Sequence, residues 1–420
     1  MANNQAKSVI IFATAYLPLV GGAEIAVDEI TKKLPDWQFD LITAKIKPGL
    51  KKEERINNVN IYRLGRGSRL DKFLLPLSGF LKAVRLNKKR KYSIIWSLMA
   101  SQASIGAVFF KIFYPSKRLL LNIQEGDPED YLKRYVLDID FLYKVLIRPW
   151  HLLSLRKADY ITALSLALKR RVLLSGARAP IEIVPNGVDI EKFKVQSSKF
   201  KVIGQKLKLK LGIKENEKVI ITISRLVKKN GIDDLVKAIQ ELTCPPRYAK
   251  CCGRGIKNQS ARLATRSVAG GELRIKLLII GSGQDEKKLK DLVKKLDLEN
   301  SILFLGGILH QDLPQYLALA DVFVRPSLSE GLGNVFLEAM AAGLPIIGTP
   351  VGGILDFLKD GETGLFCRIK NPKSIAEKIK EILSDDRLRE KLIQNGQKLA
   401  EEKYSWDIIA RQMEKIFKKI

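Results

Sequence analysis

The chain has 420 residues, 46% of them hydrophobic, and is therefore long enough for two ordinary domains. Its four cysteines form no evenly spaced framework, which excludes a small disulfide-stapled protein and favours a reducing cytoplasm. A formal net charge of +28 predicts an anionic partner, and charge alone leaves this open between nucleic acid, an acidic membrane surface and phosphorylated small molecules.

Strand and helix patterns alternate along the first half of the chain. Residues 8–13 are a short apolar run that predicts a buried strand, and residues 23–34 have the apolar spacing of a helix. Lys7 is the only basic residue before this run, and Pro18 follows the run closely. We therefore expect a strand and a loop rather than a signal peptide. Further strand patterns lie at 39–44, 92–97, 118–123, 159–164 and 181–186, and helix patterns lie at 73–86 and 103–113.

The alternation restarts after a turn signal at Pro185, Asn186 and Gly187. Continuous apolar strands that alternate with helices predict parallel sheets covered on both faces. We therefore expect an α/β protein of two doubly wound domains, with ligands at the carboxyl ends of the strands. In the second half, strand patterns lie at 218–224, 275–281, 302–306, 322–327 and 345–349, and helix patterns lie at 233–242, 285–296 and 311–319, with another helix ending near 340.

Residues 243–272 interrupt this order with an irregular, basic stretch that is rich in Gly, Arg and Ser. The stretch contains Cys244, Cys251 and Cys252, but neither histidine of the chain lies near it in sequence, and a zinc site requires four regularly spaced ligands. The D-x-D letters at 138–140 fall within a helical pattern. We expect a surface insertion and no metal site.

Two glutamates, Glu330 and Glu338, stand eight positions apart around a glycine-rich loop. The pattern predicts a strand ending in that loop and then a helix that begins at Asn334 or Val335, and Asn334 is a good N-cap residue. Gly331 and Gly333 let the backbone approach a ligand, and the first turn of a helix favours phosphate. The residues alone leave a second interpretation open, in which Glu338 stabilises the helix dipole and Glu330 is a surface charge.

The stretch 329–349 resembles the E-x7-E signature of glycosyltransferase family 4, whose members are retaining enzymes with the GT-B fold. The resemblance implies two Rossmann-like domains facing across a cleft. Residues 1–196 would bind the acceptor, residues 197–404 would bind the nucleotide-sugar donor, and a C-terminal helix at about 405–420 would pack back on the first domain. The same family is matched by "GGAE" (21–24), "VPNGVDIEKF" (184–193), "ISRL" (223–226), "LLIIGSG" (277–283), "DVFVRPS" (321–327) and "YSW" (404–406).

Carried over by position, the resemblance implies that Glu330 holds hydroxyls of the donor sugar and that Glu338 holds the ribose. Arg225 would neutralise the departing diphosphate, a role that suits an always-charged, fork-shaped guanidinium. The other implied donor contacts are the amides of Leu332, Gly333 and Asn334 beside Gly331, and Gly21 and Gly22, which would cover the diphosphate from the N-terminal domain.

One departure from the family pattern concerns the positive charge of the site. The family usually pairs its arginine with a lysine just before a glycine, whereas this chain has Asn230 at that place. Lys229, one residue earlier, is an alternative phosphate contact. Both residues are therefore included among the expected donor contacts.

A second departure concerns a histidine that many members have near the anomeric centre. This chain has Gln124, Glu125 and Asp127 in that region, and we take them as candidate acceptor-side residues. Neither His151 nor His310 replaces the missing histidine by position, so we expect both to be structural or surface residues.

The expected function is retaining transfer of a sugar from a nucleotide-diphosphate sugar to a glycan, lipid-linked or other hydroxyl acceptor, in cell-envelope polysaccharide or glycolipid synthesis. The departing phosphate itself can accept the acceptor's proton, so stabilisation of charge matters more than a strong protein base. No cofactor or metal is expected, and no nucleic-acid partner, because the lysines are spread over nearly every predicted helix. The alternative is a catalytically inactive relative that binds nucleotide sugar.

Residues 69–92 combine an apolar face with five basic residues between positions 85 and 91. This pattern leaves two interpretations open: contact with an anionic membrane that carries a lipid-linked acceptor, or packing on the first sheet with a basic outer face. No run of 18 apolar residues predicts a membrane-spanning helix. We expect a cytoplasmic protein, with a peripheral position at the inner face of the membrane as the open alternative.

Overall fold

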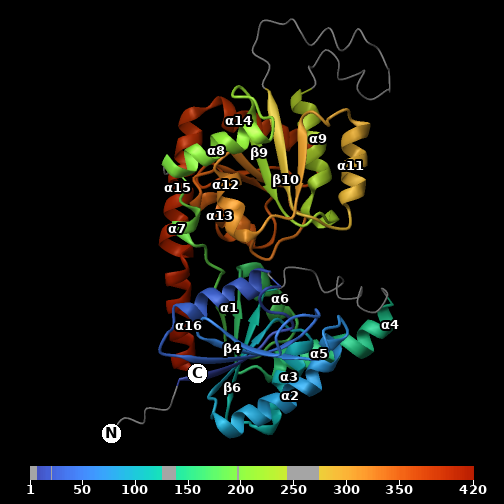
Figure 1. Cartoon of the computed structure of the whole chain (residues 1–420), viewed down its shortest axis with the longest axis vertical. Helices are drawn as coiled ribbons and strands as arrows, with labels where there is room; N and C mark the ends of the chain where they lie inside the picture. The colour runs from blue at the N-terminus through green and yellow to red at the C-terminus, as the bar shows by residue number, and fades with distance from the viewer. Residues whose placement is uncertain (1–6, 20, 125–138, 196–197, 244–273) are drawn as a thin grey trace, which may run out of the picture. The chain divides into compact units, whose positions relative to one another are not determined.

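The computed structural model describes residues 7–19, 21–124, 139–195, 198–243 and 274–420, shown in colour in Figure 1. The chain divides into two compact units, Met1–Gly187 with Tyr404–Ile420, and Val188–Lys403. The division precedes the expected boundary at 196/197 because the short helix α7 (Ile190–Phe193) packs against α13 (Asn334–Ala341) of the second unit.

The first unit is built on an eight-stranded sheet with the order β3-β4-β2-β1-β5-β6-β7-β8. Its strands run parallel except for β3, which pairs antiparallel with β4. The bounds are β1 (Ser8–Phe12), β2 (Gln38–Ala44), β3 (Glu53–Ile56), β4 (Val59–Leu64), β5 (Ile94–Leu98), β6 (Arg118–Ile123), β7 (Tyr160–Ala163) and β8 (Ile181–Ile183).

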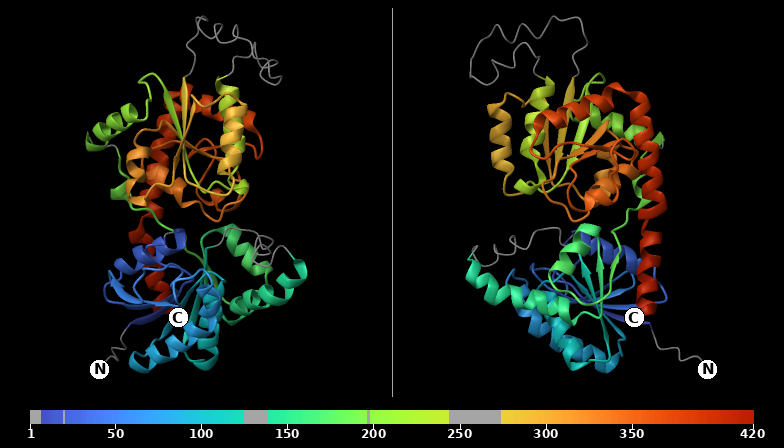
Figure 2. Two further views of the ribbon diagram at one scale, coloured as in Figure 1. Left: turned by 45° about the vertical axis from the view of Figure 1, so that its right-hand side comes forward. Right: turned by 180° about the vertical axis from the view of Figure 1, so that it is seen from behind.

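Helices cover both faces of this sheet because successive side chains of each buried strand point to opposite sides (Figure 2). In β1, Val9 and Ile11 pack with α1 and α16, whereas Ile10 and Phe12 pack with α2 and α3. The helices are α1 (Gly22–Lys32), α2 (Asp71–Lys89), α3 (Gln102–Phe113), α4 (Asp140–Leu142), α5 (Arg148–Lys157), α6 (Leu166–Leu174) and α16 (Trp406–Lys419), with a π-helical turn at Tyr143–Ile147.

The C-terminal helix α16 belongs to the first unit and packs beside α1. Its Phe417 ring lies 5.2 Å from that of Trp37 and 5.4 Å from that of Trp96. A Cβ on Gly187 would lie 2.7 Å from the Trp406 ring, so only glycine allows this approach. The turn at the end of the first strand series and the chain's last helix therefore fit together.

The second unit is built on a parallel six-stranded sheet with the order β11-β10-β9-β12-β13-β14. Its strands are β9 (Lys218–Ile223), β10 (Ile275–Ile280), β11 (Ile302–Gly306), β12 (Val322–Arg325), β13 (Ile346–Gly348) and β14 (Leu365–Phe366). The chain leaves β9 toward β10 and returns to its other side at β12. This switch point is where ligands bind in doubly wound sheets.

Helices α9, α11 and α14 cover one face of this sheet and bury Ile220, Leu277 and Val322. On the other face the Phe323 ring of β12 meets that of Phe336 in α13, at 5.2 Å. Besides α7 and α13, the helices of this unit are α8 (Ser198–Lys210), α9 (Ile232–Thr243), α11 (Glu286–Lys295), α12 (Leu313–Leu317), α14 (Pro372–Ser384) and α15 (Asp386–Tyr404), with 3₁₀ turns at Lys228–Asn230, His310–Asp312 and Gly352–Asp356.

The prediction of two doubly wound α/β domains is confirmed. The hairpin β3–β4 was not predicted because its exposed strand β3 lacks an apolar run. Almost all of the insertion at 243–272 lies outside the described residues. In the parts of the chain that the structure describes, no helix is long and apolar enough to cross a membrane.

Candidate active site

The E-x7-E loop joins β12 to α13 at the carboxyl edge of the second sheet. We expected Asn334 to cap α13, but Gly333 occupies the cap and Asn334 is the first helical residue. Gly333 has a φ of +89°, and a Cβ there would lie 2.8 Å from the Phe336 ring. Only glycine reaches this backbone conformation without strain, and it turns the chain into the helix. Glu338 then lies one turn inside α13, as predicted.

Neighbouring loops hold this segment in place through its backbone. Gly353 N–H donates to the Glu330 carbonyl at 3.2 Å, and Leu328 N–H donates to the Lys229 carbonyl at 2.6 Å. The Thr349 hydroxyl donates to the Ser327 carbonyl in a short hydrogen bond. The loops that follow β9, β12 and β13 are thereby tied into one surface.

The carboxylate of Glu330 is held on one of its oxygens. Arg325 Nη2 lies 2.8 Å from Glu330 Oε2, and the Ser327 hydroxyl donates to the same oxygen at 3.4 Å. The Arg325 and Glu330 side chains are 12% and 14% exposed, so this ion pair is largely shielded from water. The shielding strengthens the pair relative to one on the surface.

Asn230 lies inside this arrangement and is 1% exposed. Its Nδ2 donates to the Arg225 carbonyl at 2.6 Å, and its Oδ1 accepts from Arg325 Nη2 at 3.3 Å. The side chain of Arg225 is exposed, and that of Lys229 is half-buried in the same turn. The residue at the place of the expected lysine is therefore a buried bridge between two loops.

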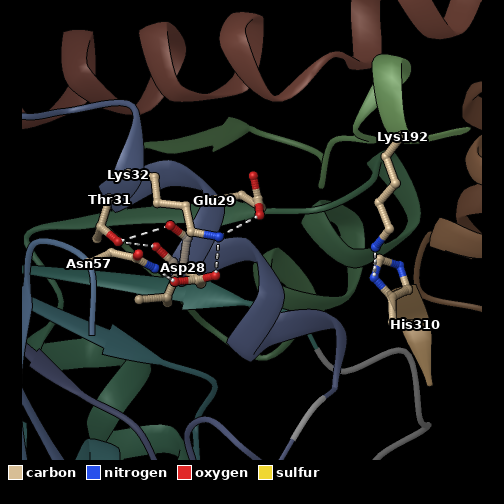
Figure 3. Close-up of polar contacts among 8 residues, drawn as sticks. Asp28, Glu29, Thr31, Lys32, Asn57, Lys192 and His310 are labelled. Carbon is tan, nitrogen blue, oxygen red and sulfur yellow. Dashed lines mark hydrogen bonds and ion pairs between the residues drawn. The ribbon is translucent and has the colours of Figure 1, made fainter. Parts of the chain in front are cut away.

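Glu338 has a histidine partner that the sequence pattern did not predict. His310 Nε2 lies 2.8 Å from Glu338 Oε1. On the other side of the ring, Lys192 Nζ lies 2.8 Å from His310 Nδ1, as Figure 3 shows. Because an ammonium group only donates, Nδ1 accepts and the ring proton sits on Nε2, which donates to Glu338. The Phe193 ring, centred 5.6 Å away, packs beside this imidazole.

His310 lies in the turn that follows β11, and a position beyond the carboxyl end of a strand was the one available signal for it. The Glu338 side chain is 10% exposed and that of His310 is 31% exposed. The contact therefore stands at the boundary between the interior and the surface, where an oriented carboxylate can meet a ligand.

The first unit gathers a separate polar network around Gln124, one of the candidate acceptor-side residues. Gln124 Nε2 donates to Asn122 Oδ1 at 2.8 Å, and Asn186 Nδ2 donates to Gln124 Oε1 at 3.2 Å. Asn186 also reaches the Gly22 carbonyl at 3.5 Å. The other two candidates, Glu125 and Asp127, lie outside the described residues.

Gly21 and Gly22 form the start of α1, as the cap and the first helical residue. Burial raises the pKa of the Glu24 carboxyl group, and hydrogen bonds from the backbone of Glu24 and Gly21 partly offset this rise. A Cβ on Gly21 would lie 2.6 Å from that carboxylate. A first-turn carboxylate that accepts a hydrogen bond from the backbone of the cap residue is half of a capping box. Glu24 therefore has a structural role at this helix start.

Two protein-family models match the chain. The model for glycosyl transferases group 1 matches residues 205–399, and the model for glycosyltransferase family 4 matches residues 20–192. The chain belongs to glycosyltransferase family 4. The two matches fall largely in the two separate units, as expected from the motifs on both sides of Gly187.

Two curated relatives of this glycosyltransferase are each 30% identical to it. One is the uncharacterized glycosyltransferase MJ1607 of Methanocaldococcus jannaschii, over 65% of the chain and 63% of that protein. The other is a GDP-mannose-dependent monoacylated alpha-(1-6)-phosphatidylinositol monomannoside mannosyltransferase of Corynebacterium glutamicum, over 63% and 64%. The chain thus spans just under two thirds of the length of both relatives.

Solved structures resemble the family 4 chain over nearly all of its length. Anabaena Alr3699/HepE in complex with UDP-glucose is 20% identical, has a TM-score of 0.75, and is matched over 98% of this chain and 100% of that one. The sucrose-phosphate synthase from Thermosynechococcus elongatus is also 20% identical, has a TM-score of 0.77, and is matched over 98% of each chain. The two sheets and these two neighbours together show the GT-B fold that the resemblance implied.

Proposed function

We propose that the protein is a retaining glycosyltransferase that moves a sugar from a nucleotide-diphosphate sugar to a hydroxyl acceptor, in the synthesis of an envelope polysaccharide or glycolipid. The observation that carries this proposal is the E-x7-E loop. It presents Glu330 and Glu338 on either side of a helix start, each carboxylate oriented by a separate cationic or hydrogen-bonding partner.

The loop offers a complementary site for each part of such a donor. Glu338 accepts hydrogen bonds from the ribose, and Glu330 accepts them from the sugar. The amides of Leu332, Gly333 and Asn334 and the start of α13 face the diphosphate, which the positive end of a helix dipole stabilises. HepE, which has the same fold, forms a complex with UDP-glucose.

The transfer breaks the bond between the anomeric carbon and the donor phosphate oxygen and forms a bond from that carbon to the acceptor oxygen. The acceptor's proton passes to the departing phosphate. The exposed Arg225 guanidinium stabilises the diphosphate charge as it develops, so the step requires no strong protein base. We propose no metal or other cofactor in this reaction.

The acceptor side of the proposal rests on the outer face of α2 in the first unit. The cap residue Leu70 and, along one stripe of the helix, Leu74, Leu77 and Leu81 are exposed, and Leu74 is 65% exposed. The stripe continues into the exposed Arg85, Lys88 and Lys89. An apolar half followed by a basic half fits the surface of an anionic membrane.

The exposed face of α2 continues onto α3 through aromatic side chains. Phe113 is 69% exposed, and its ring lies 4.9 Å from that of Phe80. The first unit thus uses one face of α2 for its core and leaves the other apolar. We propose that this second face binds anionic lipid and brings the site to a lipid-linked acceptor. The name of the Corynebacterium relative contains a monoacylated phosphatidylinositol monomannoside, which is a sugar on a lipid.

A donor panel tests the proposed chemistry. Wild-type protein and Glu338→Ala are incubated with UDP-, GDP- and ADP-sugars, and the released sugar is followed by proton NMR. We expect hydrolysis of one nucleotide class, release of the anomer present in the donor, and loss of this activity in Glu338→Ala at unchanged stability. Binding of a donor without any turnover, with candidate acceptors present, would instead identify an inactive nucleotide-sugar-binding relative.

Vesicle sedimentation tests the proposed membrane contact. The protein is mixed with vesicles of phosphatidylcholine alone or with phosphatidylglycerol, and Leu74→Gln/Leu77→Gln is compared with wild type. Both leucines are exposed, so the change leaves the fold intact and lowers binding to the anionic vesicles. Leu209→Gln, at a still more exposed leucine of the second unit, is the control. Equal sedimentation of all three proteins contradicts the contact.

A further inference from the structure

Arg325 is an arginine at the end of a buried central strand. It is the last residue of β12, which lies between β9 and β13, and it stands in register with Gly348. The three residues before it in β12 are fully buried. A charged side chain at such a place is expensive unless partners compensate its charge.

The partners of Arg325 all come from the candidate site. A continuous polar chain runs from the Arg225 carbonyl through Asn230 to Arg325 Nη2, and from there to Glu330 Oε2. The residues belong to the end of β12 and to the two loops that follow the adjacent strands β9 and β12. The guanidinium therefore fixes the position of one loop against the other.

This contact divides the two oxygens of Glu330. Both side-chain contacts of its carboxylate, from Arg325 and Ser327, fall on Oε2. Within the described residues, Oε1 has no side-chain partner and is the oxygen left for a sugar hydroxyl. A carboxylate held in this way has its orientation set before the donor arrives.

The geometry points to Arg325 as a positioning residue for Glu330, with Asn230 as the buried bridge that aims its guanidinium. This inference rests on the proposed function, because Glu330 is the residue that would hold the donor sugar. Arg325 thereby supplies positive charge beside the place where this chain has Asn230 instead of the family's usual lysine. The positive charge beside Asn230 therefore comes from a residue of β12, whereas in the family it usually comes from a lysine in the turn after β9.

Kinetics of four variants in the full-length protein, and of the double variant Arg325→Met/Glu330→Gln that completes a double-mutant cycle, test this role. Arg325→Met removes the charge, and Arg325→Lys keeps the charge but loses the fork. Glu330→Gln removes the partner, and Asn230→Lys/Arg325→Met returns a charge from the other loop. Arg389→Met, which breaks the Arg389–Asp386 pair of an exposed helix in the same unit, is the matched control.

We expect Arg325→Met to lower kcat for donor hydrolysis by about 100-fold, with the Kd of the nucleoside diphosphate changed less than about threefold. Arg325→Lys should fall between Arg325→Met and wild type. Asn230→Lys/Arg325→Met should recover about tenfold of the lost kcat. In a double-mutant cycle, Arg325→Met should cause little further loss in the Glu330→Gln background.

The outcomes separate this inference from the proposed function. A wild-type protein that neither binds nor hydrolyses any nucleotide sugar contradicts the proposed function. A wild type that is active, together with a folded Arg325→Met that retains its kcat, or that loses nucleotide binding as much as kcat, contradicts the inference alone. If Arg325→Met fails to fold because Glu330 is left unpaired, the double variant Arg325→Met/Glu330→Gln removes both charges and should fold. The positioning role of Arg325 is then judged from Arg325→Lys, and a wild-type kcat in Arg325→Lys would contradict that role.

Discussion

At the scale of single residues, the orientation of Glu338 depends on a histidine from a distant part of the chain. Lys192 fixes the tautomer of His310, and the proton on Nε2 then points at the carboxylate. This arrangement orients one oxygen of Glu338 and leaves the other for the ribose contact that we propose. The spacing of the two glutamates is visible in the sequence, but their partners are distant in sequence and become visible only in the fold.

Replacing His310 should therefore weaken nucleotide binding. We expect His310→Phe to raise the Kd of the nucleoside diphosphate by about tenfold, because a hydrogen bond to a charged group contributes about 1.5–3 kcal/mol. His310→Gln, whose amide can still donate to Glu338, should lose less. Calorimetric titration measures both, with His151→Gln in the first unit as the control. Equal dissociation constants for all four proteins would rule out this role for His310.

Cys367 illustrates the opposite case, a reactive group made inert by its surroundings. The thiol is 1% exposed and donates to the Gly348 carbonyl at 3.4 Å. Burial raises its pKa to about 12, so the neutral thiol persists at pH 8 in the folded state and the reactive thiolate forms only at far higher pH.

A thiol titration tests this state of Cys367. In a variant with Cys244, Cys251 and Cys252 replaced by Ser, we expect no reaction with a disulfide reagent at pH 8 until denaturant is added. One equivalent of thiol should then react, because the unfolded state exposes Cys367 at its ordinary pKa. Rapid reaction in the native protein would show that the thiol is accessible.

At the scale of elements, the strands were the most predictable feature. Buried parallel strands appear in the sequence as continuous apolar runs, and β1, β9 and β10 all follow that rule. Helix starts were less predictable, because Asn334 had the side chain of a cap while Gly333 had the required backbone freedom. The outer face of α2 was left open, since an apolar stripe in sequence does not distinguish a buried face from an exposed one.

The cap of α13 should be sensitive to a single methyl group. Gly333→Ala forces an L-residue into the left-handed region, which costs about 1–2 kcal/mol of unfolding free energy. It also adds a Cβ 3.2 Å from Glu330 Cγ, so turnover should fall together with stability. Urea unfolding and donor hydrolysis measure the two effects. Gly307→Ala, where a Cβ meets nothing within 4 Å, is the control, and equal behaviour of the two variants would contradict a special role for glycine at position 333.

At the scale of the whole molecule, the alternation of apolar strands and helices predicted the fold class, whereas composition predicted an anionic partner without identifying it. The net charge of +28 is compatible with a phosphorylated donor, a nucleic acid or an anionic membrane as the partner. The resemblance of the E-x7-E loop to glycosyltransferase family 4 favoured a nucleotide-sugar donor, since the residues alone left a helix-dipole role for Glu338 and a surface charge at Glu330 open. The role of Asn230 was not predictable, because its partner Arg325 stands 95 residues away in the sequence.

Metal removal tests the electrostatics of the whole site. If the Arg225 guanidinium and the start of α13 neutralise the diphosphate, donor hydrolysis should be unchanged by excess EDTA. Arg225→Ala should lower kcat by about 100–1,000-fold at unchanged stability, because the side chain is exposed and acts on the leaving group. Loss of activity in EDTA that returns with magnesium or manganese would contradict metal-independent transfer.

The central claim is that Glu338 and Glu330 hold different parts of one donor. The most direct test is calorimetric titration of the nucleoside diphosphate and of the matching nucleotide sugar into wild type, Glu338→Gln and Glu330→Gln. We expect Glu338→Gln to weaken both ligands by about 10–100-fold, and Glu330→Gln to weaken only the nucleotide sugar. Wild-type dissociation constants for both ligands in both variants would contradict the claim.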